Sequence, residues 1–223
     1  MKKIFLTLFV ISLCFYTSLF AGFQPNQGQL SGGIGHVGTD ELVYVPTLNS
    51  ITNTTEIKTF EYDPGFSFYG AYGLTSKLSA FFNMTPYSYQ NKITGDKSDL
   101  SYMKLGIQFN WLNESFLKMY QQIYFLSYSK KNTFTLVTVP EEVSKRFNAT
   151  KLIFQFNITN SLFILDKTRP FVSFEYYLDT PSEFTEKHFV SFGVLFEFTE
   201  KINVIAEYNS DRKSTGILLK YSL

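Results

Sequence analysis

Few side chains in this sequence have the type and the spacing that catalysis requires. The chain has two histidines, His36 and His188, and Ser191 follows the second by three positions. In an extended strand that spacing puts the serine and the histidine on opposite faces, so they do not form a nucleophile and its base. The sequence contains no cysteine, histidine and carboxylate cluster with metal-ligand spacing, and no glycine-rich phosphate loop. We therefore expect a protein that is not an enzyme and that uses no cofactor or metal.

Three polar residues near the C-terminus form a candidate site of another kind. If a tight turn occupies 199–201, Glu197 lies opposite Asn203, and a second turn at 210–213 puts Asn203 opposite Lys220. Opposed residues of paired strands share one face of a sheet. When it is enclosed, such a row satisfies its own charge; when it lines a passage, it selects solutes. Whether the row is enclosed or lines a passage depends on the fold of the strands that carry it.

Composition and charge exclude several classes of protein. Hydrophobic residues make up 44% of the 223 residues, aromatic residues 18% and charged residues 17%, which is the opposite of a disordered chain. The formal net charge of +1 offers no field that attracts phosphates, so we expect no nucleic-acid partner. The length suits a single domain.

The N-terminus has the pattern of an export signal. Two lysines precede an almost wholly apolar run that ends at Phe20, and the small residue Ala21 follows where a signal peptidase can cut. We expect residues 1–21 to be the signal peptide. Two alternatives stay open, namely a lipoprotein signal that ends at Cys14 and an uncleaved helical anchor.

The rest of the chain alternates apolar and polar residues with a period of two, which is the pattern of strands. Between 188 and 198 the even positions from Val190 onward are apolar, while the odd positions include Ser191 and Glu197. No segment of the mature chain shows the sustained 3.6-residue apolar stripe of a helix. The expected strands are ten, at 28–37, 57–72, 78–89, 99–111, 116–128, 150–158, 169–178, 188–198, 202–209 and 214–223.

The apolar faces of these strands decide the fold class. Each apolar run covers about ten residues, the length that crosses a bilayer on a tilt. The opposite faces carry charged residues in mid-strand, among them Lys104, Lys151 and Glu175, which suits a wet lumen. An open sheet edge has no partner in lipid, so the sheet must close. We predict that residues 22–223 form an all-β, transmembrane, antiparallel up-and-down barrel of ten strands with the polar row in its lumen. A soluble β-sandwich is the alternative.

Loop lengths predict the orientation of this barrel. The short connections 73–77, 112–115 and 199–201 fall on one rim, which in such barrels faces the periplasm. The longer connections fall on the outer rim, at 38–56, 90–98, 129–149 and 179–187. Two connections are exceptions: the short 210–213 lies on the outer rim and the ten-residue 159–168 on the inner rim. The loop 129–149 contains a strand-like piece from Thr133 to Val139 that extends a hairpin above the membrane. If this piece crosses instead, the number of strands becomes eight or twelve.

Three short motifs resemble known barrels. The ending Tyr221-Ser222-Leu223 resembles the C-terminal signal of Gram-negative outer-membrane barrels. Gln27-Gly28-Gln29-Leu30, and the segment from Tyr72 to Leu78 followed by Pro86-Tyr87, resemble a group of transporter-like, phenol-degradation-pathway-type outer-membrane barrels. The resemblance covers about residues 27–87 and the C-terminus. It implies localisation in the bacterial outer membrane, contact with its lipid, and assembly by the barrel-assembly machinery through the last strand.

Two functions are compatible with these features. The first is a narrow channel or a transport-assisting barrel for small solutes. Ten strands enclose a lumen that side chains largely fill, so only slow or solute-specific passage is expected. The alternative is a structural, adhesive or surface-exposed barrel with no transport activity, which acts through its outer loops.

Overall fold

The computed structural model describes residues 25–39, 41–114, 116–136, 141–157, 168–179, 187–199, 201–210 and 214–223. The expected signal peptide, residues 1–21, lies outside the described residues. The regular elements that the described residues form are all β-strands. None of these residues forms a helix that is long and apolar enough to span a membrane.

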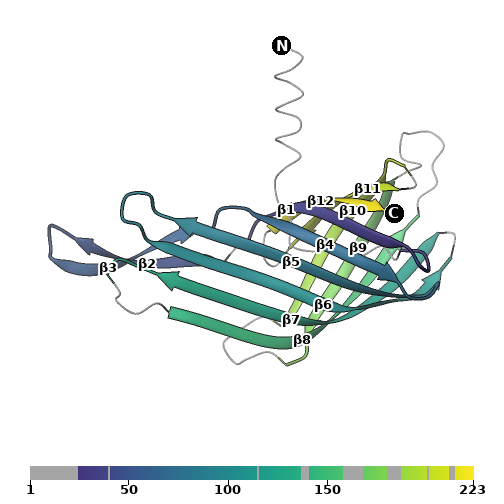
Figure 1. The fold of residues 1–223 in the computed structure, drawn as a ribbon, viewed down its shortest axis with the longest axis horizontal. Helices are drawn as coiled ribbons and strands as arrows, with labels where there is room; N and C mark the ends of the chain where they lie inside the picture. The colour runs from purple at the N-terminus through teal and green to yellow at the C-terminus, as the bar shows by residue number, and fades with distance from the viewer. Residues whose placement is uncertain are drawn as a thin grey trace, which may run out of the picture.

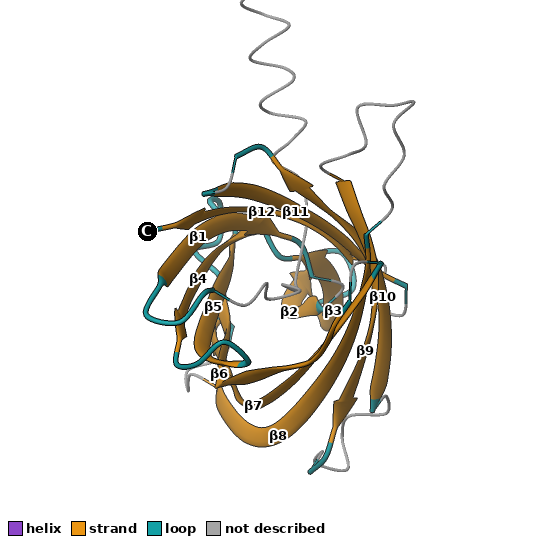
Figure 2. Cartoon of the chain, turned by 90° about the vertical axis from the view of Figure 1, so that its right-hand side faces the viewer, coloured by secondary structure: helices purple, strands orange, loops and turns teal. Residues whose placement is uncertain are grey.

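Ten of the described strands close into one antiparallel barrel (Figure 1, Figure 2). The order around the wall is β1-β12-β11-β10-β9-β8-β7-β6-β5-β4, and β1 pairs with β4 to complete the ring. These strands are β1 (Leu30–Val37), β4 (Gly65–Gly73), β5 (Leu78–Gln90), β6 (Lys97–Asn113), β7 (Leu117–Thr133), β8 (Glu141–Phe156), β9 (Thr168–Tyr177), β10 (His188–Glu197), β11 (Ile202–Asn209) and β12 (Ser214–Ser222). The prediction of an all-β, antiparallel up-and-down barrel of ten strands is therefore confirmed.

The two ends of the barrel differ. Short turns join β4 to β5, β6 to β7 and β10 to β11, and they form what we call the short-turn rim. At the opposite end, the long-loop rim, β5 to β8 project beyond the other strands (Figure 1). β6 and β7 have 17 residues each and β8 has 16, whereas β9 and β10 have 10 each. The wall is therefore tall on one side and short on the other.

The projecting strands correct the expected bounds of several segments. The segment 129–149, expected as a loop, is mostly a hairpin, because β7 continues to Thr133, β8 begins at Glu141 and Asn132 pairs with Glu141. The expected strands 99–111, 116–128 and 150–158 were accordingly too short or misplaced at the long-loop rim. Outward residues of the projecting parts, such as Lys131, are polar, so the apolar alternation ends before the strand does. Residues 137–140 at the tip lie outside the described part of the chain.

The region before β4 also differs from expectation. The segment 57–72, expected as one strand, is two strands that are separated at 62–64. β3 (Thr54–Glu61) pairs with β2 (Leu42–Asn49) in a separate two-stranded sheet, so the segment 38–56, expected as a loop, is largely strand. Pro64 has no N–H for a ladder and ends the run. The exposed residues of β3 are mostly polar, so the sequence showed no apolar face that would have marked it as a separate element.

The two faces of the barrel wall carry different side chains. Two clusters of buried apolar and aromatic residues fill the inside. The larger one draws on every barrel strand from β4 to β12 except β6, whose partly buried Tyr102 packs against it. On the outside, large apolar side chains are exposed on every barrel strand, in what we call the apolar belt. Its members include Ile34, Phe68, Phe82, Leu105, Ile123, Leu152, Phe174, Phe192, Ile202 and Leu219.

Candidate functional site

Four charged residues cross the interior of the barrel. Lys151 Nζ lies 2.8 Å from Glu207 Oε1, and each of these side chains is only 1% exposed. Lys104 Nζ lies 2.9 Å from Glu175 Oε1, which also accepts a hydrogen bond from Tyr124. Because the register puts Lys151 opposite Glu175, the charges alternate from Lys104 through Glu175 and Lys151 to Glu207. We call these four residues the charge quartet.

Bulky side chains pack beside three members of the charge quartet. Ile153, Tyr177 and Ile205 occupy the inward positions two residues from Lys151, Glu175 and Glu207, respectively. All three belong to the larger core cluster, and none is more than 1% exposed. A buried ion pair is tolerated only when both charges are compensated, and its separation is costly. At this level the inward side chains are held in place both by packing and by ion pairing.

The predicted polar row lies nearer the short-turn rim. The register places Glu197 opposite Asn203 and Asn203 opposite Lys220. Glu197 Oε2 lies 3.4 Å from Arg169 Nη2, while Lys220, 2% exposed, has its Nζ 5.8 Å from the ring centroid of Tyr69. The two charged ends of the row therefore contact different neighbours. Selection of solutes by this row stays a prediction.

Sequence reasoning found the charge quartet only in part. Lys104, Lys151 and Glu175 were recognised as inward charges, but Glu207 was not. Glu207 shares its parity with Ile205 and Asn209, which gave a weak signal for an inward position. Arg169, the partner of Glu197, lies near the start of β9 and was not identified as an inward charge.

The β2–β3 hairpin is fastened to the long-loop rim. Glu41, just before β2, accepts hydrogen bonds from the hydroxyls of Tyr102 (2.6 Å) and Tyr128 (2.7 Å), and its carboxylate lies 3.2 Å from Lys130 Nζ. These three donors belong to the inner faces of β6 and β7. We call Glu41 and its three partners the Glu41 latch. It fixes the base of the hairpin to the tall side of the wall.

Apolar contacts support the latch. Val43 and Val45 of β2 are buried in the second core cluster, together with Tyr62, Tyr87 and Leu100. Viewed along the barrel, the hairpin lies across the middle of the ring (Figure 2). Burial raises the pKa of Tyr62, whose hydroxyl pairs with that of Ser98 at 2.8 Å, so this phenol remains neutral. The base of the hairpin is thus packed against the inner face of the tall wall, and the hairpin projects beyond the long-loop rim (Figure 1).

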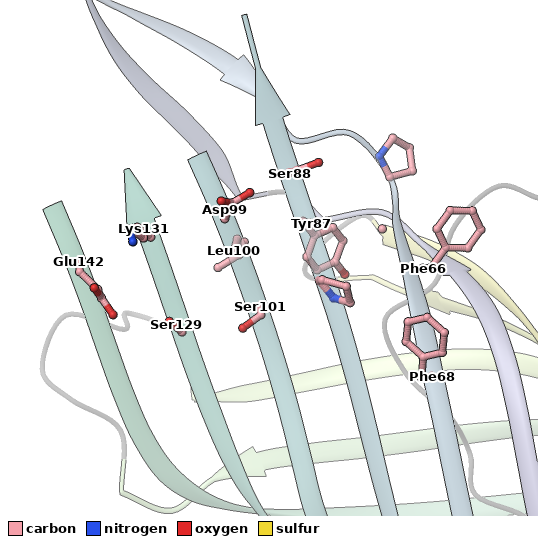
Figure 3. Close-up of a pocket in the computed structure, with 13 residues that line it drawn as sticks. Phe66, Phe68, Tyr87, Ser88, Asp99, Leu100, Ser101, Ser129, Lys131 and Glu142 are labelled. Atoms are coloured by element: carbon pink, nitrogen blue, oxygen red, sulfur yellow. The ribbon is translucent and has the colours of Figure 1, made fainter. Parts of the chain in front are cut away.

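The outer wall carries a pocket of about 660 Å³ near the long-loop rim. Phe66 and Phe68 of β4 and Pro86 of β5 form its apolar edge. Its polar part runs across β5, β6, β7 and β8, where Figure 3 shows the side chains that line it, namely Ser88, Asp99, Ser101, Ser129, Lys131 and Glu142. These polar residues have the outward parity of their strands, so this pocket, the outer-wall pocket, faces away from the lumen.

The two histidines lie apart on the outer face of the wall. His36 at the end of β1 contacts the ring of Phe66 edge-on at 5.3 Å, and His188 at the start of β10 stacks on Tyr176 at 6.1 Å. Within the described residues, no three His, Cys, Asp or Glu side chains gather as a metal site would require. The histidines therefore act here as packing partners of aromatic rings.

Comparison with solved structures finds barrels of bacterial proteins at low similarity. Ail, the attachment invasion locus protein of Yersinia pestis, is 14% identical with a TM-score of 0.41, covering 88% of this chain and 99% of that chain. The outer membrane protein OprG from Pseudomonas aeruginosa is 10% identical with a TM-score of 0.44, covering 90% and 98%. The N-terminal β-barrel domain of OprF from the same organism is 6% identical with a TM-score of 0.40, covering 88% and 98%.

No family model and no curated protein matches the chain. The likeness to solved structures is too low to identify a family or a function, and the resemblance to the phenol-degradation-type barrels stays a prediction. The fold and the sites themselves define the class: a closed, ten-stranded antiparallel barrel with an apolar outer belt and a charged, aromatic interior.

Proposed function

We propose that this protein is an integral barrel of the bacterial outer membrane whose lumen is closed and which acts through its long-loop rim. The membrane placement is supported by the apolar belt. A soluble monomer rarely exposes a large contiguous apolar surface, whereas hydrocarbon chains cover such a belt without cost. On β6 the outward residues from Met103 to Trp111 span nine positions, a length that suits the hydrocarbon core. The short-turn rim then faces the periplasm.

The single observation that carries the proposed role is the filled interior. A solute passing through the lumen would have to separate the charge quartet and displace the hairpin that the Glu41 latch holds. Removing one partner of a buried ion pair costs about 3–5 kcal/mol, so spontaneous opening is rare. This supports the surface-exposed alternative over the narrow channel. The projecting strands β5 to β8 and the hairpin supply the surface.

Planar-bilayer recording of the purified, folded protein tests this role. The folded state is checked by comparing the gel mobility of the unboiled protein with that of the boiled protein, because a folded barrel and its unfolded chain migrate differently. We expect no discrete conductance steps from the wild-type protein. Reproducible steps whose size depends on the ion would overturn the closed-barrel proposal and favour the channel. In that case Lys220→Glu should change the ion preference if the polar row selects solutes.

A further inference from the structure

We propose that the outer-wall pocket binds one phosphorylated glycolipid of the surrounding membrane leaflet. The acyl chains lie along Phe66 and Phe68, and the sugar phosphate lies on the polar residues of β5 to β8. This inference rests on the membrane placement proposed above, because the occupant is a lipid that the barrel meets only in a bilayer.

The pocket lies where the apolar belt gives way to polar wall. Phe68 is in register with Met84, and Met84 with Met103, so these three mark the upper edge of the belt. Two outward positions nearer the long-loop rim, the row from Ser88 through Asp99 and Lys131 to Glu142 crosses four strands. An amphipathic molecule at this level has its apolar part beside the belt and its polar part beside that row.

The pocket exists because β4 and β5 stop pairing before either strand ends. Their ladder runs from Gly73 opposite Ser79 to Phe68 opposite Met84, although β4 continues to Gly65 and β5 to Gln90. Pro86 in β5 has no N–H for the ladder. The backbones of β4 and β5 still approach each other closely behind the pocket. A Cβ added at Gly65 would lie only 2.1 Å from the carbonyl oxygen of Pro86, so no opening separates the two strands there.

The apolar edge is accessible to a lipid chain. Phe66 is 57% exposed and Phe68 45% exposed. Tyr87 and Leu100, which also touch the pocket, are buried from the inner side and close its base. The volume of about 660 Å³ lies in the range that holds a single small-molecule ligand. The pocket therefore suits part of one lipid and not a protein segment.

The charges of the polar part favour a sugar phosphate. Lys131 lies between Asp99 and Glu142 in register, and Lys97, 2.8 Å from Asp99, adds a second cation at the edge. A headgroup with negative charge alone would meet both carboxylates, and a hydrocarbon alone would leave the polar row unsatisfied. A sugar phosphate offers its phosphate to the lysines and its hydroxyl donors to the carboxylates.

Serine hydroxyls complete the match. Ser88, Ser101 and Ser129 line the pocket, and each is small enough to leave depth for a ring while it donates or accepts hydrogen bonds. These residues come from three neighbouring strands, as Figure 3 shows. The arrangement is a hydroxyl-rich platform beside an aromatic edge.

Native mass spectrometry of the detergent-purified protein with added lipid A tests the proposal. We expect one lipid A per barrel, at concentrations where phosphatidylethanolamine does not bind. Lys131→Glu should weaken this binding about tenfold, the loss of one charge-assisted contact. Ser101→Phe should weaken it at least as much by filling the pocket. The matched controls Lys58→Glu and Ser50→Phe, on the hairpin, should bind as the wild type does.

Three results would overturn the proposal. They are equal binding of phosphatidylethanolamine and lipid A, unchanged binding by both pocket variants, and equal affinity for lipid A and for the soluble phosphorylated disaccharide without acyl chains. Each variant is first shown to fold by its unboiled gel mobility. A barrel that needs detergent but binds no lipid A contradicts the pocket alone, whereas a protein recovered without detergent contradicts the membrane placement.

Discussion

Lys151 shows how single residues keep the interior of this barrel closed. It is almost completely buried, it forms an ion pair with Glu207, and it lies opposite Glu175 in register. Its inward position was predicted from parity alone, because alternation assigns each side chain of a strand to a face. Its partner Glu207 lies on β11, three strands further around the wall, and sequence spacing carries no information about contacts across a lumen.

At the residue scale we predict that the Lys151–Glu207 pair behaves as a unit. Lys151→Met leaves the buried Glu207 uncompensated and should lower the free energy of unfolding by about 3–5 kcal/mol. The double variant Lys151→Met, Glu207→Gln should recover much of this loss. The measurement is urea unfolding in lipid vesicles, followed by the fluorescence of Trp111. Equal destabilisation by the single and double variants would show that the two residues do not interact.

Strands and hairpins were predictable where they carry the apolar belt and less so elsewhere. The segments 188–198, 202–209 and 214–223 were expected almost as the structure has them, since each has one continuous apolar face. β2, the first residues of β3 and the projecting ends of β7 and β8 were taken for loops, and the rest of β3 was taken for the start of the next strand. Their stability comes from each other and from the tall wall, so their own sequences lack the alternation that marks a lipid-facing strand.

At the element scale we predict that the Glu41 latch holds the β2–β3 hairpin in place. Glu41→Ala removes an acceptor from Tyr102, Tyr128 and Lys130, and hydrogen bonds to a charged group contribute about 1.5–3 kcal/mol each. Backbone amides of β2 and β3 should then exchange with solvent faster. Hydrogen exchange of the folded barrel measures this effect.

Glu61→Ala is the matched control for the latch. Glu61 lies opposite Leu42 at the base of the same hairpin, but its side chain is exposed. The control should leave exchange in the hairpin unchanged. Equal acceleration by both variants would contradict the prediction. It would show that the loss of any negative charge near the base of the hairpin speeds exchange, whether or not that charge belongs to the Glu41 latch.

The whole molecule combines an apolar outer belt with an interior that holds packed apolar and aromatic side chains together with buried ion pairs. With the membrane placement proposed above, the belt meets hydrocarbon, while the inner face meets the side chains of the opposite wall. Closure of the ring by β1 and β4 leaves no unpaired edge at the level of the belt, which is the condition for residence in lipid.

At the scale of the whole molecule we predict that the cost of a charge on the outer wall depends on its height. Leu105→Arg, in the middle of the belt, should lower the free energy of unfolding by about 2–4 kcal/mol, whereas Thr133→Arg at the projecting end should cost about 0–1 kcal/mol. Unfolding in vesicles measures both values. Equal costs at the two positions would argue against a membrane around the belt.

The sequence by itself determined the all-β class, predicted ten strands for the barrel and indicated the outward face of most of them. Alternation is a local property, and a strand that meets hydrocarbon must display it. Only the tertiary structure decided that the charge quartet crosses the lumen, that Glu41 fastens the hairpin and that a pocket opens beside Pro86. These features join residues from distant strands, and their contacts depend on register and on the unequal height of the wall, which no local pattern records.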